Sequence, residues 1–300
     1  MLSKSQLLTR WAAIPANVRG MVWMGLSGLI FASFMSIVRL LSQDMHPVQV
    51  SFLRYALGLI FLVPLLMRMQ VSDFREARLS LHALRGVTHG IAVMLWFYAM
   101  SRISIAEVSA IGFTSPVFAT LGAAIVLGER LRMRRIMAIA AGLLGAFIII
   151  RPGFTEVDPG AIAMLMAAPI FGFSDVIAKL LMRRESGPAV VGFLSLFVTL
   201  VSLGPAIYVW EHPTLEQWGL LALTAGLANL GHLTMVQAFK IAEMSAVQPV
   251  KFLQLFWAAL IGFLVFSELP SVWTWIGSAI IVLSAYYIAR REAALKAKQP

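Results

Sequence analysis

Three charged side chains lie well inside long apolar stretches of this sequence: Arg54, Asp175 and Lys251. A charge near the middle of a lipid bilayer costs roughly 2.5–3.5 kcal/mol on insertion scales, so such a group is expected to face a cavity or a partner. Arg54 and Lys251 are therefore candidates to bind an anionic group of a small ligand, such as a carboxylate. The alternatives are a structural ion pair, or a long side chain that extends to the interface.

Asp175 has two interpretations. A desolvated carboxylate can titrate near neutral pH, which makes Asp175 a candidate proton site or a site for a substrate cation. Lys179 follows four residues later and would share a helix face with Asp175. A local Asp175–Lys179 pair is therefore the structural alternative.

Aromatic and polar side chains in the same stretches can complete a mostly apolar binding site for a planar or amphipathic ligand. The candidates are Trp96, Tyr98, Phe252, Gln248, Gln254 and His89. Each allows a structural interpretation as well. Trp96 and Tyr98 suit an aromatic belt at the membrane interface. Phe252 can simply pack, and His89 can form a hydrogen bond between helices.

Pro116 and Pro249 interrupt apolar runs, where a proline frees a carbonyl and kinks a helix. Such breaks can act as hinges in transporters, although packed helices also tolerate them. The sequence has no cysteine, no P-loop and no His/Glu spacing typical of a metal site. We therefore expect no catalytic residues, no metal and no cofactor.

The composition requires lipid as the solvent for much of the chain. Of the 300 residues, 60% are hydrophobic and 13% are charged, and the mean hydropathy is +0.85. Soluble domains have about 45–50% apolar and about 25% charged residues. The formal net charge of +10 would suggest nucleic acid in a soluble protein. Here the basic residues flank apolar runs, so we expect the bilayer and no nucleic acid as a partner.

Ten apolar runs approach the length of about 20 residues that crosses a hydrocarbon core. They cover residues 20–41, 48–68, 85–101, 104–127, 133–150, 159–182, 188–210, 217–239, 244–267 and 272–289. With the N-terminus inside, 18 of the 24 Lys and Arg residues fall on the inner side. Only Arg39, Arg102 and Arg151 fall on the outer side. This asymmetry predicts ten transmembrane helices with both termini cytoplasmic.

The two halves of the chain resemble each other. In order, the matches are Phe31–Arg39 with Phe171–Lys179, AEVSA (Ala106–Ala110) with AEMSA (Ala242–Ala246), and Glu129 with Glu268. Five spans per half is an odd number, so the second half is expected to lie inverted relative to the first. Inverted repeats are common in secondary transporters, where they give two conformations open to opposite sides.

We therefore divide the chain into four segments. These are a cytoplasmic N-terminal segment (1–18), a first repeat of five helices (19–153), a second repeat of five helices (154–290) and a cytoplasmic tail (291–300).

The residues of both halves resemble one family. FLRYALGLIFLVPLL (Phe52–Leu66), the run Ala106–Gly153 and the segment from Pro249 through Trp257 to Glu268 are similar to EamA-type transporters of the drug/metabolite transporter superfamily. The resemblance covers about residues 20–290. It implies a 5+5 inverted repeat, a central cavity and transport without ATP. Many relatives carry an acidic or aromatic residue near Lys251, so a lysine there is expected to change the ligand charge that is tolerated.

These observations predict a secondary active transporter in the inner membrane, with alternating access for a small metabolite. An amino acid or a similar carboxylate-bearing compound is the leading substrate. The alternatives are S-adenosylmethionine, a riboflavin-like vitamin, and cationic drugs, which would suit Asp175 rather than Lys251. A membrane-embedded lipid-modifying enzyme is the alternative of another class, and the carboxylates are too scattered to favour it. The oligomeric state is not predicted.

Overall fold

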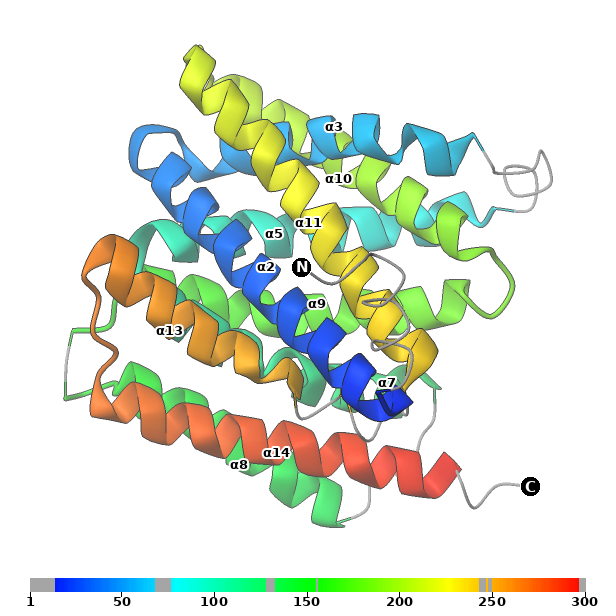
Figure 1. Ribbon diagram of the computed structural model, residues 1–300, viewed down its shortest axis with the longest axis vertical. Helices are drawn as coiled ribbons and strands as arrows, with labels where there is room; N and C mark the ends of the chain where they lie inside the picture. The colour runs from blue at the N-terminus through cyan, green and yellow to red at the C-terminus, as the bar shows by residue number, and fades with distance from the viewer. Residues whose placement is uncertain are drawn as a thin grey trace, which may run out of the picture.

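The computed structural model describes residues 14–67, 77–127, 133–154, 156–242, 247 and 250–296. All regular elements in this part of the chain are α-helices, as predicted, and they cross one another in one bundle (Figure 1). Their bounds are α2 (Ala16–Asp44), α3 (Pro47–Leu66), α5 (Leu79–Arg102), α6 (Ile105–Gly112), α7 (Ser115–Leu127), α8 (Met133–Ile150), α9 (Pro159–Leu181), α10 (Gly187–Tyr208), α11 (Leu215–Ile241), α13 (Leu253–Phe266) and α14 (Val272–Lys296).

Six described helical segments are long and apolar enough to cross a membrane. They are Ala16–Asp44, Pro47–Pro64, Ile105–Gly122, Pro159–Leu181, Ala189–Tyr208 and Leu215–Ile241. Three further apolar helices are shorter: Ile136–Ile150, Leu253–Phe266 and Val272–Tyr287. Large apolar side chains are exposed along most of these helices. Such a surface suits lipid rather than water, so the fold is that of a helical membrane protein.

The predicted span 85–101 falls on α5, which is not one of these six segments although it has 24 residues. Its N-terminal half carries the buried polar residues His82 and Arg85. α5 packs against α2, α3, α9 and α10. Its polar groups therefore meet protein rather than lipid.

Side-chain caps begin several of the helices, as their sequences require. Ser104 and Glu107 form a capping box at the start of α6, and Thr214 and Gln217 form one at the start of α11. The Asp158 carboxylate accepts a hydrogen bond from the Gly160 N–H at the start of α9, at 2.7 Å. These caps satisfy backbone N–H groups that have no carbonyl partner within the helix.

The predicted span 104–127 is broken into α6 and α7 instead of forming one helix. The break lies at Phe113 and Thr114, directly before Pro116 in the first turn of α7. Proline lacks an N–H and disfavours helical geometry in the residue before it. The chain therefore turns tightly, and the Thr114 N–H donates to the Ile111 carbonyl at 2.9 Å.

The predicted span 244–267 also differs from a single long helix. α13 begins at Leu253, with Phe252 as its N-cap residue. Gln248 and Pro249 lie outside the described residues. The fourth and ninth predicted spans thus both contain a helix boundary near the middle, at Phe113 and at Phe252.

Helices from the two halves of the sequence pack against each other in pairs. α2 packs against α11, α5 against α9, α3 against α10, and α8 against α14. In Figure 1, α3 and α10 lie along the top of the bundle, and α8 and α14 lie along the bottom. Since each pair joins one helix from each half, the two halves share a single core.

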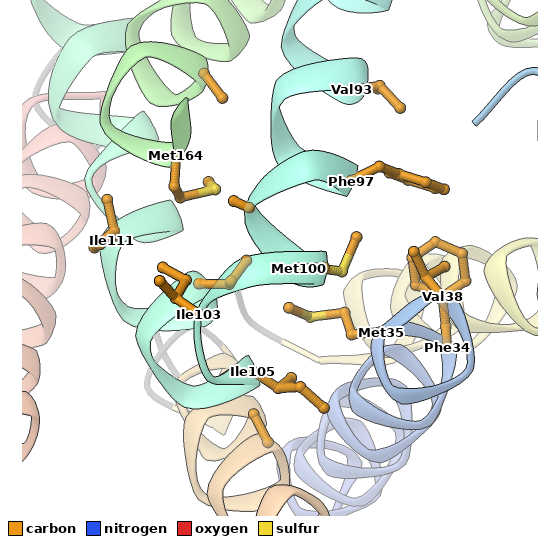
Figure 2. Close-up of a cluster of buried hydrophobic side chains, with 14 of the residues drawn as sticks. Phe34, Met35, Val38, Val93, Phe97, Met100, Ile103, Ile105, Ile111 and Met164 are labelled. Carbon is orange, nitrogen blue, oxygen red and sulfur yellow. The ribbon is translucent and has the colours of Figure 1, made fainter. Parts of the chain in front are cut away.

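That core is centred on α2, α5 and α6. Phe34 and Met35 of α2 point toward Phe97 and Met100 of α5 and toward Ile105 of α6 (Figure 2). Each of these side chains is at most 2% exposed. Lipid tails are as apolar as these residues, so close packing rather than exclusion of water holds the helices together here.

α8 and α14 approach each other most closely at two glycines. A Cβ on Gly145 would lie 2.7 Å from the Gly277 carbonyl oxygen and 2.7 Å from Cγ1 of Ile281. A Cβ on Gly277 would clash with the Gly145 carbonyl oxygen and lie 2.6 Å from Ile149. Small residues are required where the backbones of two membrane helices meet.

We predict that Gly145→Val separates α8 from α14 and destabilises the fold by about 1–3 kcal/mol, the usual cost of overpacking. Thermal unfolding of the purified protein in detergent measures the loss. Gly219→Val in α11 is the control, because a Cβ there would meet nothing within 4 Å. Equal melting temperatures for the two variants would show that the α8–α14 contact is not needed for stability.

Candidate functional site

A cavity of about 210 Å³ lies between α2, α11 and the start of α13. Its lining residues are Met24, Ser27, Gly28, Phe31, His232, Met235, Lys251 and Gln254. Two of the predicted binding residues, Lys251 and Gln254, are among them. A mainly apolar wall with a few polar groups is typical of small-molecule sites.

Two glycines determine how closely the cavity walls approach each other. A Cβ on Gly28 would lie 3.2 Å from the backbone nitrogen of Gln254, and a Cβ on Gly231 would lie 3.1 Å from the Phe31 ring. The Ser27 hydroxyl donates a hydrogen bond of 2.9 Å to the Gly231 carbonyl. These contacts hold α2 against α11 and place the Phe31 ring over the α11 backbone.

Phe31 and His232 meet edge to face, with ring centroids 5.0 Å apart and an interplanar angle of 78°. The sequence analysis did not assign either residue to the site. Met24 and Phe31 have helical spacing with the other lining residues of α2 and therefore share one face of that helix. That spacing could have identified them, but only if the direction of this face had been known.

Three cations and one carboxylate interact around this cavity. Asp175 of α9 interacts electrostatically with Arg85 and Lys251. His232 interacts with Arg54 and Lys251. Because cations outnumber the carboxylate among these groups, the region favours a ligand with negative charge.

Arg54 and Arg85 are held differently. The Arg54 guanidinium carbon lies 4.0 Å from the centroid of the Tyr55 ring and 5.6 Å from that of Phe34. Its Nε is buried and has no hydrogen-bond partner among the described residues. Arg85 instead donates to the Val190 carbonyl at 3.0 Å. Arg54 therefore keeps donor capacity at a cationic site lined by aromatic rings.

His89 and Trp96 do not line the cavity and lie instead at an aromatic cluster around Phe171. The His89 imidazole meets the Phe171 ring edge to face, with centroids 5.0 Å apart. Its Nδ1 lies 3.1 Å from the Ser174 hydroxyl. Trp96 contacts the other side of the cluster, 6.0 Å from the Phe171 centroid.

The other predicted residues occupy different places. Phe252 contacts Phe113 edge to face, with centroids 5.1 Å apart. Tyr98 is partly exposed near the end of α5, and Pro116 is exposed at the start of α7. Gln248, like Pro249, lies outside the part of the chain that is described. These positions leave the binding and hinge roles as predictions.

Arg39 closes one end of the bundle, beyond the cavity. One of its terminal nitrogens donates to the carbonyls of Met100, at 3.0 Å, and Ile103. The other forms an ion pair with Glu268, and the guanidinium lies over the Phe266 ring. Arg39 thus joins the end of α2 to the ends of α5 and α13, which belong to different halves.

The Arg39–Glu268 pair is shielded from solvent, with the two side chains 14% and 18% exposed. Burial raises the pKa of the Glu268 carboxyl above its ordinary value, and the charge of Arg39 opposes that change. Ser267 places Glu268 by adopting a left-handed conformation, with φ of 55°. The sequence offers no local partner for Glu268, because Arg39 is far away along the chain.

Charged groups also join the halves elsewhere. Arg102 lies 3.7 Å from Asp158 at the end that carries Arg39. Near the other end of α5, the buried His82 lies 2.5 Å from Glu185, which also pairs with Arg78. Both ends of α5 are therefore bound to segments of the second half.

A sequence profile of the EamA-like transporter family matches residues 18–151 and 158–290. The chain belongs to this family. EamA-like transporters are multi-pass membrane proteins and not enzymes, which agrees with the apolar helices and with the expectation of no catalytic residues.

Named relatives of this EamA-like transporter carry small molecules. It is 30% identical to the riboflavin transporter of Vibrio cholerae, over 92% of this chain and 94% of that protein. It is 24% identical to the S-adenosylmethionine uptake transporter of Rickettsia prowazekii, over 93% and 95% of the two chains. A crystal structure with 20% identity has the same fold, with a TM-score of 0.58, and the match covers 89% of this chain and 96% of that one.

We predict that reversing either charge of the Arg39–Glu268 pair opens this end of the EamA-like transporter, because like charges would then face each other. The reporter is a single cysteine at Met35, one helical turn from Arg39, in a chain without native cysteines. Arg39→Glu or Glu268→Arg is expected to increase labelling by a membrane-impermeant maleimide several-fold. Lys240→Glu, at an exposed position, is the control.

Combining Arg39→Glu with Glu268→Arg restores opposite charges and is expected to return labelling toward the original rate. Labelling that stays high in the double variant, or never rises in the single ones, would contradict a closing role for the pair.

Proposed function

We propose that this protein is a secondary active transporter that moves a small carboxylate-bearing metabolite across the inner membrane, with an amino acid as the leading substrate. The observation that carries the proposal is the position of Lys251, which lines a small cavity between helices of the two halves. The family and the named relatives support the class of function.

We further propose ten transmembrane helices in a 5+5 inverted repeat. In such a repeat α9 and α5 are the counterparts of α2 and α11, so exchanging the halves converts the α2–α11 pair into the α5–α9 pair. Phe113 and Phe252 are 139 residues apart, as are Glu129 and Glu268. Equivalent residues touch only near a two-fold axis, and the contact between Phe113 and Phe252 supports one at the two helix breaks.

The structure suits one state of an alternating-access cycle. The end that carries Arg39 is closed by ion pairs between the halves, and the charge distribution predicts that this is the outer end. Asp175 and His232 have exposed side chains in the opposite half of the bundle. We therefore assign the structure to an inward-facing state.

The cavity favours a small anion. Lys251 and Gln254 meet it at the start of α13, where the positive end of a helix dipole adds to the charge of the lysine. Its volume of about 210 Å³ is below the roughly 300–1,000 Å³ of sites for drug-sized ligands. An amino acid fits this description. A riboflavin-like vitamin or S-adenosylmethionine, which the relatives favour, would require the cavity to widen.

Lys251→Gln is predicted to weaken binding of a carboxylate-bearing ligand by about tenfold or more, the value of a charge-assisted hydrogen bond. A thermal-shift screen of the purified protein against amino acids, nucleosides, vitamins and drugs identifies the ligand and measures its affinity. Lys240→Gln, at the exposed end of α11, is the matched control. The substrate proposal fails if no carboxylate compound stabilises the protein, or if Lys251→Gln binds it normally.

Asp175 is the candidate for proton coupling, because it lies opposite Arg85 and Lys251. We expect transport in proteoliposomes to respond to an imposed pH gradient, and Asp175→Asn to remove that response. A variant that responds like the original protein would exclude the role.

The topology predicts that single cysteines at Ser3 and Gln299 lie on the inner side and that one at Glu156 lies on the outer side. In intact cells, a membrane-impermeant maleimide should therefore label only Glu156→Cys. All three should react after the membrane is permeabilised. Labelling of Ser3→Cys and Gln299→Cys from opposite sides would rule out five plus five inverted spans.

A further inference from the structure

Two aromatic–imidazole contacts cross between the halves in opposite directions. Phe31 of α2 meets His232 of α11, and Phe171 of α9 meets His89 of α5. Both pairs have centroids 5.0 Å apart, and their interplanar angles are 78° and 70°. Phe31 and Phe171 occupy matching positions in the repeat, 140 residues apart. The second contact is therefore the counterpart of the one that lines the cavity.

A cation accompanies each pair. Lys251 lines the cavity beside Phe31 and His232 and interacts electrostatically with this imidazole. Arg54 interacts in the same way with His89. The Arg54 guanidinium lies over Phe34, whose ring contacts Trp96 at 5.8 Å. Phe34 and Trp96 thus connect Arg54 to the cluster around Phe171.

Groups that can bind a ligand are present at the second pair. The buried Nε of Arg54 has no hydrogen-bond partner among the described residues, so it is available to an anionic group. His89 and Trp96 are both partly exposed. Their rings and Phe171 present edges and faces of the kind that bind a planar ring.

We infer that Phe171, His89, Trp96 and Arg54 form a second substrate subsite, which binds the planar, anionic class of ligand that Phe31, His232 and Lys251 bind. The inference rests on the proposed transport function. The two subsites are used in turn. The one with Phe31 holds the ligand when the inner side is open, and the one with Phe171 holds it when the outer side is open.

Exchange between two related subsites follows from an inverted repeat. When the halves exchange conformations, contacts made by one half are replaced by the matching contacts of the other. A ligand that bound only at Phe31 would lose its ring contact when the inner side closes. The counterpart at Phe171 supplies the same type of contact on the other side of the axis.

The experiment compares the two faces of the membrane. The concentration of indole-3-acetate that half-saturates transport is measured in right-side-out and inside-out vesicles for Phe31→Leu and Phe171→Leu. Phe171→Leu is expected to raise this concentration by about fivefold at the outer face and less than twofold at the inner face, since an aromatic contact has about this effect on binding. Phe31→Leu is expected to show the reverse.

Phe173→Leu is the matched control, because this residue lies on the same helix with an exposed side chain. A Phe171→Leu variant that behaves like Phe173→Leu, or that changes both faces equally, overturns the inference. Transport of other carboxylates without any transport of indole-3-acetate also overturns it, while the proposed function stands. Absence of all transport by the original protein removes the proposed function itself.

A second readout covers the case in which Phe171→Leu does not fold. Phe171→Cys and Phe31→Cys are each the single cysteine of their chain. Indole-3-acetate is expected to protect Phe171→Cys from a membrane-impermeant maleimide added at the outer face, and to protect Phe31→Cys at the inner face. Labelling of Phe171→Cys that the ligand does not change would overturn the inference.

Discussion

Charged and polar groups inside a bilayer find no water, and the described part of this bundle is organised around that constraint. Arg85 donates to the backbone carbonyl of Val190, and Arg39 donates to two carbonyls at the end of α5. His82 lies against Glu185. Lys251 instead faces the cavity, where a ligand can supply the missing negative charge. Apolar packing surrounds these groups but does not determine where they lie.

The helix breaks allow polar groups and backbone to meet at the centre. A continuous helix satisfies its own backbone, whereas a broken one presents unpaired N–H and carbonyl groups that need protein or a water-filled cavity. α6 and α7 are separated beside Phe113, and α13 begins after Phe252. These two rings touch each other, and Lys251 lies beside the second break. The site is therefore located where the two halves interrupt their helices together.

The interactions between the halves differ at the two levels of the bundle. Around the cavity, glycines and an aromatic ring bring α2 against α11 with few polar bonds. At the end carrying Arg39, a shielded ion pair holds α2 to α13. Ion pairs can be made and broken with discrete changes in position, whereas packed side chains resist continuous deformation. This arrangement suits a protein that alternates between two states.

The sequence by itself determined the helical membrane fold, because a composition with so few charges leaves no other solvent than lipid. It also singled out Lys251 and Gln254, since a charge in an apolar run must face something other than lipid. It did not show that Phe31 and His232 meet, that α6 and α7 separate at Phe113, or that Arg39 binds Glu268. Those contacts join segments far apart in the chain, and helical periodicity gives the face of a helix but not its neighbour. Only the tertiary structure decided them, because the packing of one half against the other sets which faces meet.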